Sequence, residues 1–169
     1  SGGWRTGSKR SIERMRVDLH CHTYYSPDAL TRFDGLLRWM DRRGIDRVAI
    51  TDHNAVEGAL EFQARAPDRF IVGEEILTDA GELLALFVHE RVPPGLPAEE
   101  SISRVRAQGG IVGASHPFDR ARVDAIGAET LDVLAQHLDF VEVLNARAVR
   151  RAECRSVVAA AHGAQARPA

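Results

Sequence analysis

Short apolar runs alternate with segments of helical periodicity along most of this chain, and that alternation restricts the fold more than any other feature. The expected strands cover residues 17–20, 47–51, 70–73, 111–115 and 140–144. The expected helices cover residues 30–43, 55–66, 98–108, 128–137 and 148–162. Strands that alternate with helices are typical of crossover units in a mainly parallel sheet. The pattern therefore predicts an α/β fold, with residues 75–88 as a hairpin inserted around the turn at 78–81.

Composition agrees with one globular domain. The chain has 169 residues, of which 44% are hydrophobic and 27% charged. That length supports one sizeable core. We expect residues 1–15, rich in glycine, serine and arginine, to be a flexible arm, and residues 16–169 to form the domain.

Charge and cysteine content exclude several classes of protein. The formal net charge is −2 and the sequence pI is near 6.4, so there is no strong nucleic-acid signature. The two cysteines, Cys21 and Cys154, form no pair with metal-site or disulfide-framework spacing. No segment has the length and apolarity of a membrane span or the core of a signal peptide. These features predict a cytoplasmic protein.

Two histidines stand at the end of the first expected strand. His20 and His22 are two residues apart, so on a strand their rings share one face and can point at one metal ion. Asp28 follows Ser26 and Pro27 in the exit loop and could add a carboxylate oxygen. Nitrogen and oxygen donors together favour zinc, manganese or iron over calcium.

Further polar residues follow other expected strands. Asp52 and His53 follow the second strand, Glu75 the third, and His116 the fourth. Because the carboxyl ends of parallel strands gather at one face, we expect these groups to converge. A single strand-end histidine could equally be a hydrogen-bonded structural group. For the whole set a metal centre is the better interpretation, since so many buried polar atoms need partners.

Four motifs in register resemble those of the PHP (polymerase and histidinol phosphatase) superfamily. They are Asp18-Leu-His-Cys-His-Thr23 with Ser26-Pro-Asp28, Ile50-Thr-Asp-His-Asn54, Gly73-Glu-Glu75 and His116-Pro-Phe-Asp119. The resemblance implies a distorted seven-stranded (β/α) barrel, a centre of two or three divalent ions and hydrolysis of phosphoesters. It also implies that the metal ligands are His20, His22, Asp28, His53, Glu75 and His116.

The resemblance assigns roles to these residues. Glu75 corresponds to a carboxylate that bridges two ions, and we expect Glu75, His53, His116 and Asp52 to serve catalysis around a metal-activated water. Asp52 is expected to orient a neighbouring histidine rather than to bind metal. Arg120 and Arg122 could bind a substrate phosphate, although they could also be solvated loop residues.

The sequence departs from the family pattern near its end. Members of the family continue to a strand with a Gly-Ser-Asp-x-His motif that completes the metal centre, and no Asp-x-His follows Asn145 here. We therefore expect an incomplete barrel of about six strands, open at its C-terminal end. We also expect fewer ions than in the family, and a homodimer formed through the open edge.

The sequence leaves three functions open. The first is a metal-dependent phosphoesterase that acts on a small phosphate ester or nucleotide. The second is a non-catalytic or weakly active metal-binding remnant that serves as an interaction domain. The third is an amidohydrolase-like metal-dependent hydrolase, because similar histidine-rich barrels cleave C–N bonds.

Overall fold

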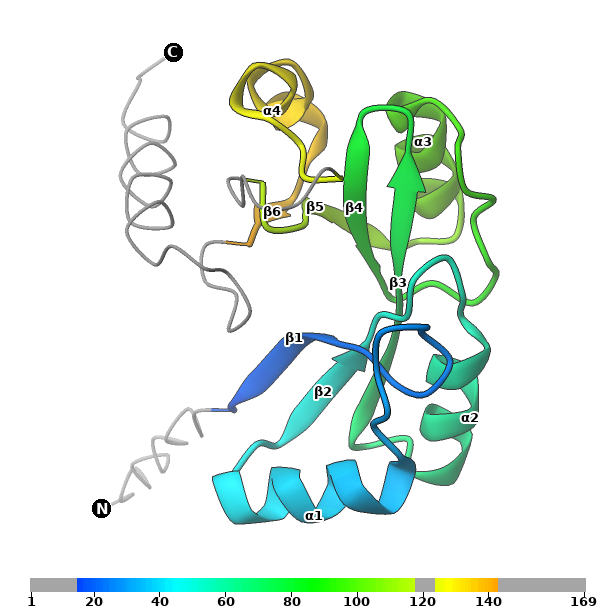
Figure 1. The fold of residues 1–169 in the computed structure, drawn as a ribbon, viewed down its shortest axis with the longest axis vertical. Coiled ribbons are helices and arrows are strands. Elements are labelled where there is room, and N and C mark those ends of the chain that lie inside the picture. The colour runs from blue at the N-terminus through cyan, green and yellow to red at the C-terminus, as the bar shows by residue number, and fades with distance from the viewer. Residues whose placement is uncertain (1–14, 118–123, 143–169) are drawn as a thin grey trace, which may run out of the picture.

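The chain alternates between strands and helices as its pattern predicts. The structure is a computed structural model that describes residues 15–117 and 124–142 (Figure 1). The strands are β1 Val17–Cys21, β2 Arg47–Ile50, β3 Phe70–Thr78, β4 Gly81–Leu86, β5 Ile111–Ala114 and β6 Phe140–Val141. The helices are α1 Phe33–Arg43, α2 Glu57–Arg65, α3 Ala98–Ala107, α4 Ala128–Leu134 and the 3₁₀ turn η1 Ala135–His137.

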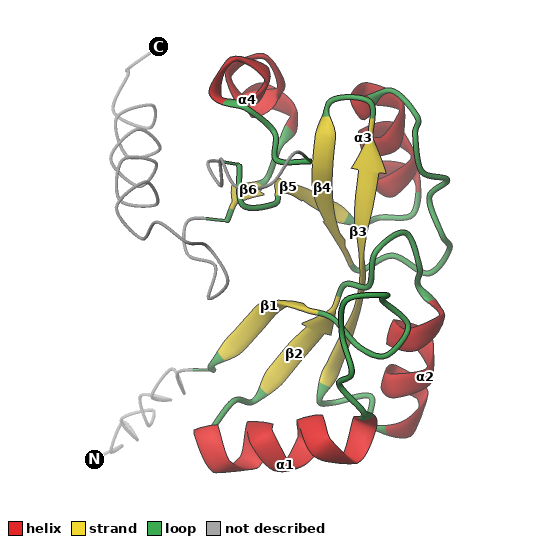
Figure 2. Cartoon of the chain, in the orientation of Figure 1, coloured by secondary structure: helices red, strands yellow, loops and turns green. Residues whose placement is uncertain are grey.

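All six described strands belong to one sheet in the order β1-β2-β3-β4-β5-β6. The pairs β1–β2, β2–β3 and β5–β6 are parallel, whereas β4 is antiparallel to both β3 and β5. The sheet curls into a half-barrel with the four α-helices on its outer side and with β1 and β6 at its two ends (Figures 1 and 2). Within the described residues, the predicted α/β fold with a curled, barrel-like sheet is confirmed.

The strand β3 joins the two halves of the sheet. Its first residues pair with β2, and Gly73 to Thr78 then pair with β4 across the turn that leads to Gly81. The predicted hairpin is confirmed. The prediction that the strand stops at Gly73 was wrong, because the chain stays extended through the two buried glutamates Glu74 and Glu75.

Three aromatic rings form the centre of the core beneath β1–β3. Phe33 of α1, Phe62 of α2 and Phe70 of β3 are buried, and the ring centroids lie 5.3 Å apart for Phe33–Phe62 and for Phe62–Phe70. The helix α1 ends, as predicted, at Gly44, whose φ of 61° suits a glycine C-cap. It begins later than predicted, since Leu30 is 91% exposed and precedes the helix.

Two predicted elements fall partly or wholly outside the described residues. These are the helix at 148–162 and the end of the strand at 140–144, and the arm at 1–14 lies outside them as well. Among the described helices, none has the length and apolarity needed to cross a lipid bilayer.

Candidate metal centre

His20 and His22 share one face of the chain, as their spacing predicts. His20 lies in β1 and His22 directly follows it, and their Nε2 atoms are 2.9 Å apart. Cys21, between them, points the other way and packs against the apolar core. Burial raises the pKa of the Cys21 thiol to about 12, which suits a packing role rather than a metal-binding one.

Glu75 is the centre of the cluster. Its Oε1 atom lies 3.3 Å from His20 Nε2 and 3.0 Å from His116 Nε2, and Ser115 donates a hydrogen bond to the same oxygen. We call His20, Glu75 and His116 the first half-site. His116 directly follows Ser115 after β5, so this half-site brings together residues of β1, β3 and the end of β5.

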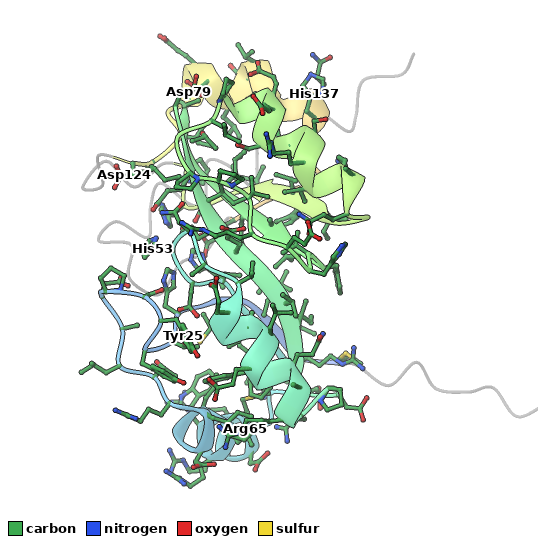
Figure 3. The ribbon with its side chains drawn as sticks, turned by 90° about the vertical axis from the view of Figure 1, so that its right-hand side faces the viewer. Tyr25, His53, Arg65, Asp79, Asp124 and His137 are labelled. Carbon is green, nitrogen blue, oxygen red and sulfur yellow. The ribbon has the colours of Figure 1, made fainter. Side chains whose placement is uncertain are left out.

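The other oxygen of Glu75 faces a second pair of histidines. Glu75 Oε2 lies 3.1 Å from His22 Nε2 and 3.2 Å from His53 Nδ1. His53 forms an isolated bridge with Glu75 just beyond β2 and is labelled in Figure 3. We call His22, His53 and Glu75 the second half-site. One carboxylate therefore gives one oxygen to each half-site.

The donor geometry fits divalent ions. Donors bound to one ion at about 2.1 Å lie about 3.0–3.4 Å apart in octahedral or tetrahedral coordination. The distances from the Glu75 oxygens to the four histidine nitrogens, 3.0–3.3 Å, lie in that range. Glu75 Oε2 is also buried and accepts no hydrogen bond from a described residue, so an ion would satisfy it.

Two more carboxylates flank the histidines. Glu82 in β4 has Oε1 3.3 Å from His53 Nδ1 and Oε2 3.4 Å from His116 Nε2. Asp28 Oδ1 lies 3.7 Å from both His22 Nδ1 and His53 Nε2, and its side chain is one-third exposed. Asp28 is thus at the solvent side of the second half-site but outside its donor group, and its role as a ligand stays a prediction.

Asp52 lies behind the second half-site, fully buried. It accepts hydrogen bonds from the Thr23 amide at 2.6 Å, the Thr23 hydroxyl at 2.7 Å and the Ser26 hydroxyl at 2.7 Å. Ser26 Oγ in turn lies 3.1 Å from His22 Nδ1. Asp52 therefore reaches a histidine, as expected of an orienting residue, but it does so through Ser26, which sequence reasoning used only as a loop signal.

Glu142 was missed by sequence reasoning. It follows β6, and its Oε2 atom lies 3.2 Å from His20 Nδ1 and accepts the His116 amide at 2.9 Å. Burial works against its charged form, but the hydrogen bond and charge of His20 outweigh it and lower the pKa of Glu142. The one available signal was a carboxylate inside the apolar run 140–144.

The backbone of His116 departs from its expected form. A residue before proline should be extended, yet His116 has a φ of 28°. The proline that follows His116 predicts an extended residue, and this prediction is wrong, because the amide is bound to Glu142 while the ring reaches Glu75 in the interior. Arg120 and Arg122, expected to bind phosphate, lie outside the described residues.

We expect protein stripped of metal ions to lose stability as the pH rises from about 6.5 to 10. Burial disfavours the charged ring of His20, but the carboxylates of Glu142 and Glu75 outweigh it and raise the pKa of His20 to about 10. A histidine whose folded pKa exceeds its unfolded value stabilises the protein below the unfolded value, and this contribution is lost as the pH passes the folded value. Urea titrations in chelator should show a fall in unfolding free energy of a few kcal/mol.

His20→Ala should make this slope shallower without removing it, because the hydrogen bond with Glu82 also raises the pKa of His53. Metal affinity should change in the opposite direction and increase over the same range, because ligand imidazoles must be neutral. A stability of the stripped protein that is constant from pH 6.5 to 10 would contradict the assignment.

Gly58→Ala should destabilise the fold, although alanine normally favours a helix. A Cβ at Gly58, in α2, would lie 2.6 Å from Asp52 Oδ2 and 2.7 Å from Tyr25 Cδ2. The expected cost is about 1–3 kcal/mol, as for overpacking. Gly35→Ala in α1 is the control, since a Cβ there meets nothing within 4 Å and should stabilise by about 0.5–1 kcal/mol. Equal changes in the free energy of unfolding for Gly58→Ala and Gly35→Ala, measured by chemical denaturation, would show that Gly58 is not packed against Asp52.

Comparison with known proteins identifies the family. The PHP domain family matches residues 18–86, which carry both residues of the His20–His22 pair, Asp52, His53 and Glu75. The uncharacterized protein MJ1587 of Methanocaldococcus jannaschii is 37% identical over 145 residues, covering 78% of this chain and 82% of the relative. The chain belongs to the PHP superfamily. MJ0417, from the same organism, is 34% identical over 143 residues, 85% of this PHP chain and 55% of the relative.

Solved structures share the PHP fold at low sequence identity. A protein from Bifidobacterium adolescentis, named as a metal-dependent phosphoesterase, gives a TM-score of 0.68 at 18% identity, covering 89% of this chain and 84% of the other. A two-domain protein from Bacteroides vulgatus, which contains a predicted PHP-like metal-dependent phosphoesterase, gives a TM-score of 0.61 at 19% identity. The match covers 76% of this chain and 44% of the other. An amidohydrolase from Chromobacterium violaceum with bound sulfate gives a TM-score of 0.55 at 17% identity, and the match covers 76% of each chain.

Proposed function

We propose that this PHP protein is a metal-dependent phosphoesterase that hydrolyses a small phosphate ester or a nucleotide. One observation carries the proposal: Glu75 gives one carboxylate oxygen to each of two histidine pairs. Two ions linked by a carboxylate are a common arrangement in enzymes that hydrolyse phosphoesters. The phosphoesterase names of two fold neighbours agree with this choice.

Each of the two ions would have its own pair of histidine ligands. His20 and His116 would hold one ion, and His22 and His53 the other, with Glu75 shared. Bound divalent ions would supply Lewis-acid charge to the phosphate oxygens and lower the pKa of a water nucleophile. Ser115 fixes Glu75, and its full burial keeps solvent away from the carboxylate on the core side. No serine or cysteine nucleophile is needed in this scheme.

A small substrate suits the charge of the chain. With a net charge of −2, the protein has little long-range attraction for a polyanion such as DNA or RNA. Local capture of one phosphate by Arg120 and Arg122 is part of the same proposal. The partly exposed Asp28 places the second half-site nearest to solvent and so to an arriving substrate.

Two alternatives use the same histidines. A non-catalytic metal-binding domain would keep the ions without turnover, and an amidohydrolase-like enzyme would cleave C–N bonds. The likeness to the Chromobacterium violaceum amidohydrolase extends to the fold, since the two sequences are 17% identical. The arrangement of Glu75 favours the phosphoesterase, and one set of assays separates all three.

The test is hydrolysis of p-nitrophenyl phosphate and of an acyl p-nitroanilide, each with Mn²⁺, Zn²⁺ or Fe²⁺ and with chelator. We expect metal-dependent release of phosphate and no anilide cleavage. Loss of a direct ligand in His20→Ala should lower the rate by about 100-fold or more, at least as much as loss of an outer partner.

His89→Ala is the matched control, because His89 is an exposed histidine whose amide is bound to Gln108. It should retain the rate of the unmodified protein. Equal phosphatase rates in His20→Ala and in the unmodified protein would refute the proposal. Bound ions without hydrolysis of either substrate would favour the non-catalytic domain.

A further inference from the structure

One acceptor atom holds both histidines of the second half-site. Ser26 has a single hydroxyl hydrogen, which it donates to Asp52. Its oxygen accepts the His53 amide at 3.0 Å and lies 3.1 Å from His22 Nδ1. Because the hydroxyl hydrogen is already used, His22 Nδ1 must be the donor. The Nε2 lone pair of His22 is thereby left for an ion.

The first half-site has the same arrangement around a different acceptor. Glu142 Oε2 lies 3.2 Å from His20 Nδ1 and accepts the His116 amide at 2.9 Å. A carboxylate has no hydrogen to give when ionised, so His20 Nδ1 donates and its Nε2 is directed at Glu75. Each half-site therefore has one acceptor that binds a ring N–H of one histidine and the amide of the other.

Glu142 is tied to the sheet through its own backbone. The Glu142 amide donates to the Ala114 carbonyl at 3.0 Å, which ties it to the end of β5. Its side chain is only 12% exposed. His116, which it binds, has a left-handed backbone that few non-glycine residues adopt, so the amide contact supports an otherwise unfavourable geometry.

We propose that Glu142 is a positioning residue for the first half-site alone, and that Ser26 positions the second half-site independently. The two metal positions would then differ in how they are supported although they share Glu75. This inference rests on the proposed function only in assuming that the half-sites bind metal ions.

The test counts tightly bound Zn²⁺ per chain after equilibrium dialysis. The unmodified protein should hold two ions, and Glu142→Ala and Ser26→Ala should each hold one. Combining Glu142→Ala with His116→Ala should cause no further loss, because both act on the first half-site. Combining it with His53→Ala should leave none. If Glu142→Ala simply disrupted the structure, the two double variants would bind the same number of ions. If Glu142 positions the first half-site, they should differ by one ion.

Glu142→Gln provides the second variant, because an amide oxygen in place of Oε2 can still accept both N–H groups but carries no charge. It should weaken one ion by about 10–100-fold and leave the other unchanged. The ¹⁵N spectrum of the histidine rings in the zinc-loaded protein should show His20 protonated at Nδ1, and Glu142→Ala should lose that signal. Circular dichroism checks that each variant is folded.

The inference is overturned if Glu142→Ala keeps both ions at unchanged affinity, or loses both. It is also overturned if the combination with His53→Ala keeps an ion. Failure of the proposed function would look different, since the unmodified protein would bind no ions or hydrolyse no phosphate ester.

Discussion

Glu75→Gln should remove both bound ions and lower phosphate-ester hydrolysis by about 1,000-fold or more, the largest effect expected of any single substitution here. Glutamine keeps the shape of the side chain but has only one acceptor oxygen and no charge. Because Glu75 Oε1 and Oε2 each serve a different half-site, neither pair of histidines would retain its shared carboxylate. Metal analysis and a phosphatase assay measure the two effects.

Glu74→Gln is the control at the neighbouring position. Glu74 is equally buried, but its Oε2 accepts the Val92 amide at 2.9 Å, away from the histidines. Burial raises the pKa of Glu74 to about 7, so its carboxyl group is partly neutral at neutral pH and an amide is a mild change. This variant should keep its ions and its rate. Two bound ions in Glu75→Gln would contradict the assigned role of Glu75.

Asp52→Ala should destabilise the protein by about 3–5 kcal/mol, as expected when a buried charged acceptor is removed and its donors are left unpaired. The change leaves the Thr23 amide and hydroxyl without their hydrogen-bond acceptor, and the Ser26 hydroxyl loses the bond that fixes its orientation. Metal affinity at the second half-site should also decrease, because Ser26 no longer has to accept from His22. Urea denaturation and zinc titration measure the two effects.

Asp68→Ala provides the comparison for Asp52→Ala. Asp68 is exposed, and an exposed carboxylate should cost no more than about 0.5 kcal/mol. A destabilisation of Asp52→Ala as small as that of Asp68→Ala would show that the buried hydrogen bonds around Asp52 do not hold the loop.

The sequence could predict the histidines of the centre because local pattern determines their positions. His20 and His22 are two residues apart at a strand end, and His53 and His116 each follow an apolar run. Parallel strands then bring these ends to one face. The hairpin around Gly81 and the C-cap at Gly44 could be predicted for the same reason, since turn and cap chemistry is local.

Other features depend on the curvature of the sheet and could not be predicted. Glu75 is not at the end of its strand, because β3 continues to Thr78 and meets β4. The contact between His20 and Glu142 spans 122 residues and forms because the sheet curls until β6 faces β1. The hydrogen bond from the His116 amide to Glu142 accompanies the left-handed backbone of His116, which departs from the local preference before proline.

Anomalous X-ray diffraction from crystals soaked in Mn²⁺ or Zn²⁺ tests the central claim most directly. We expect two anomalous peaks, one beside each carboxylate oxygen of Glu75, with His20 and His116 around one and His22 and His53 around the other. A single peak, or ions bound away from Glu75, would contradict a centre built from two half-sites that share one carboxylate.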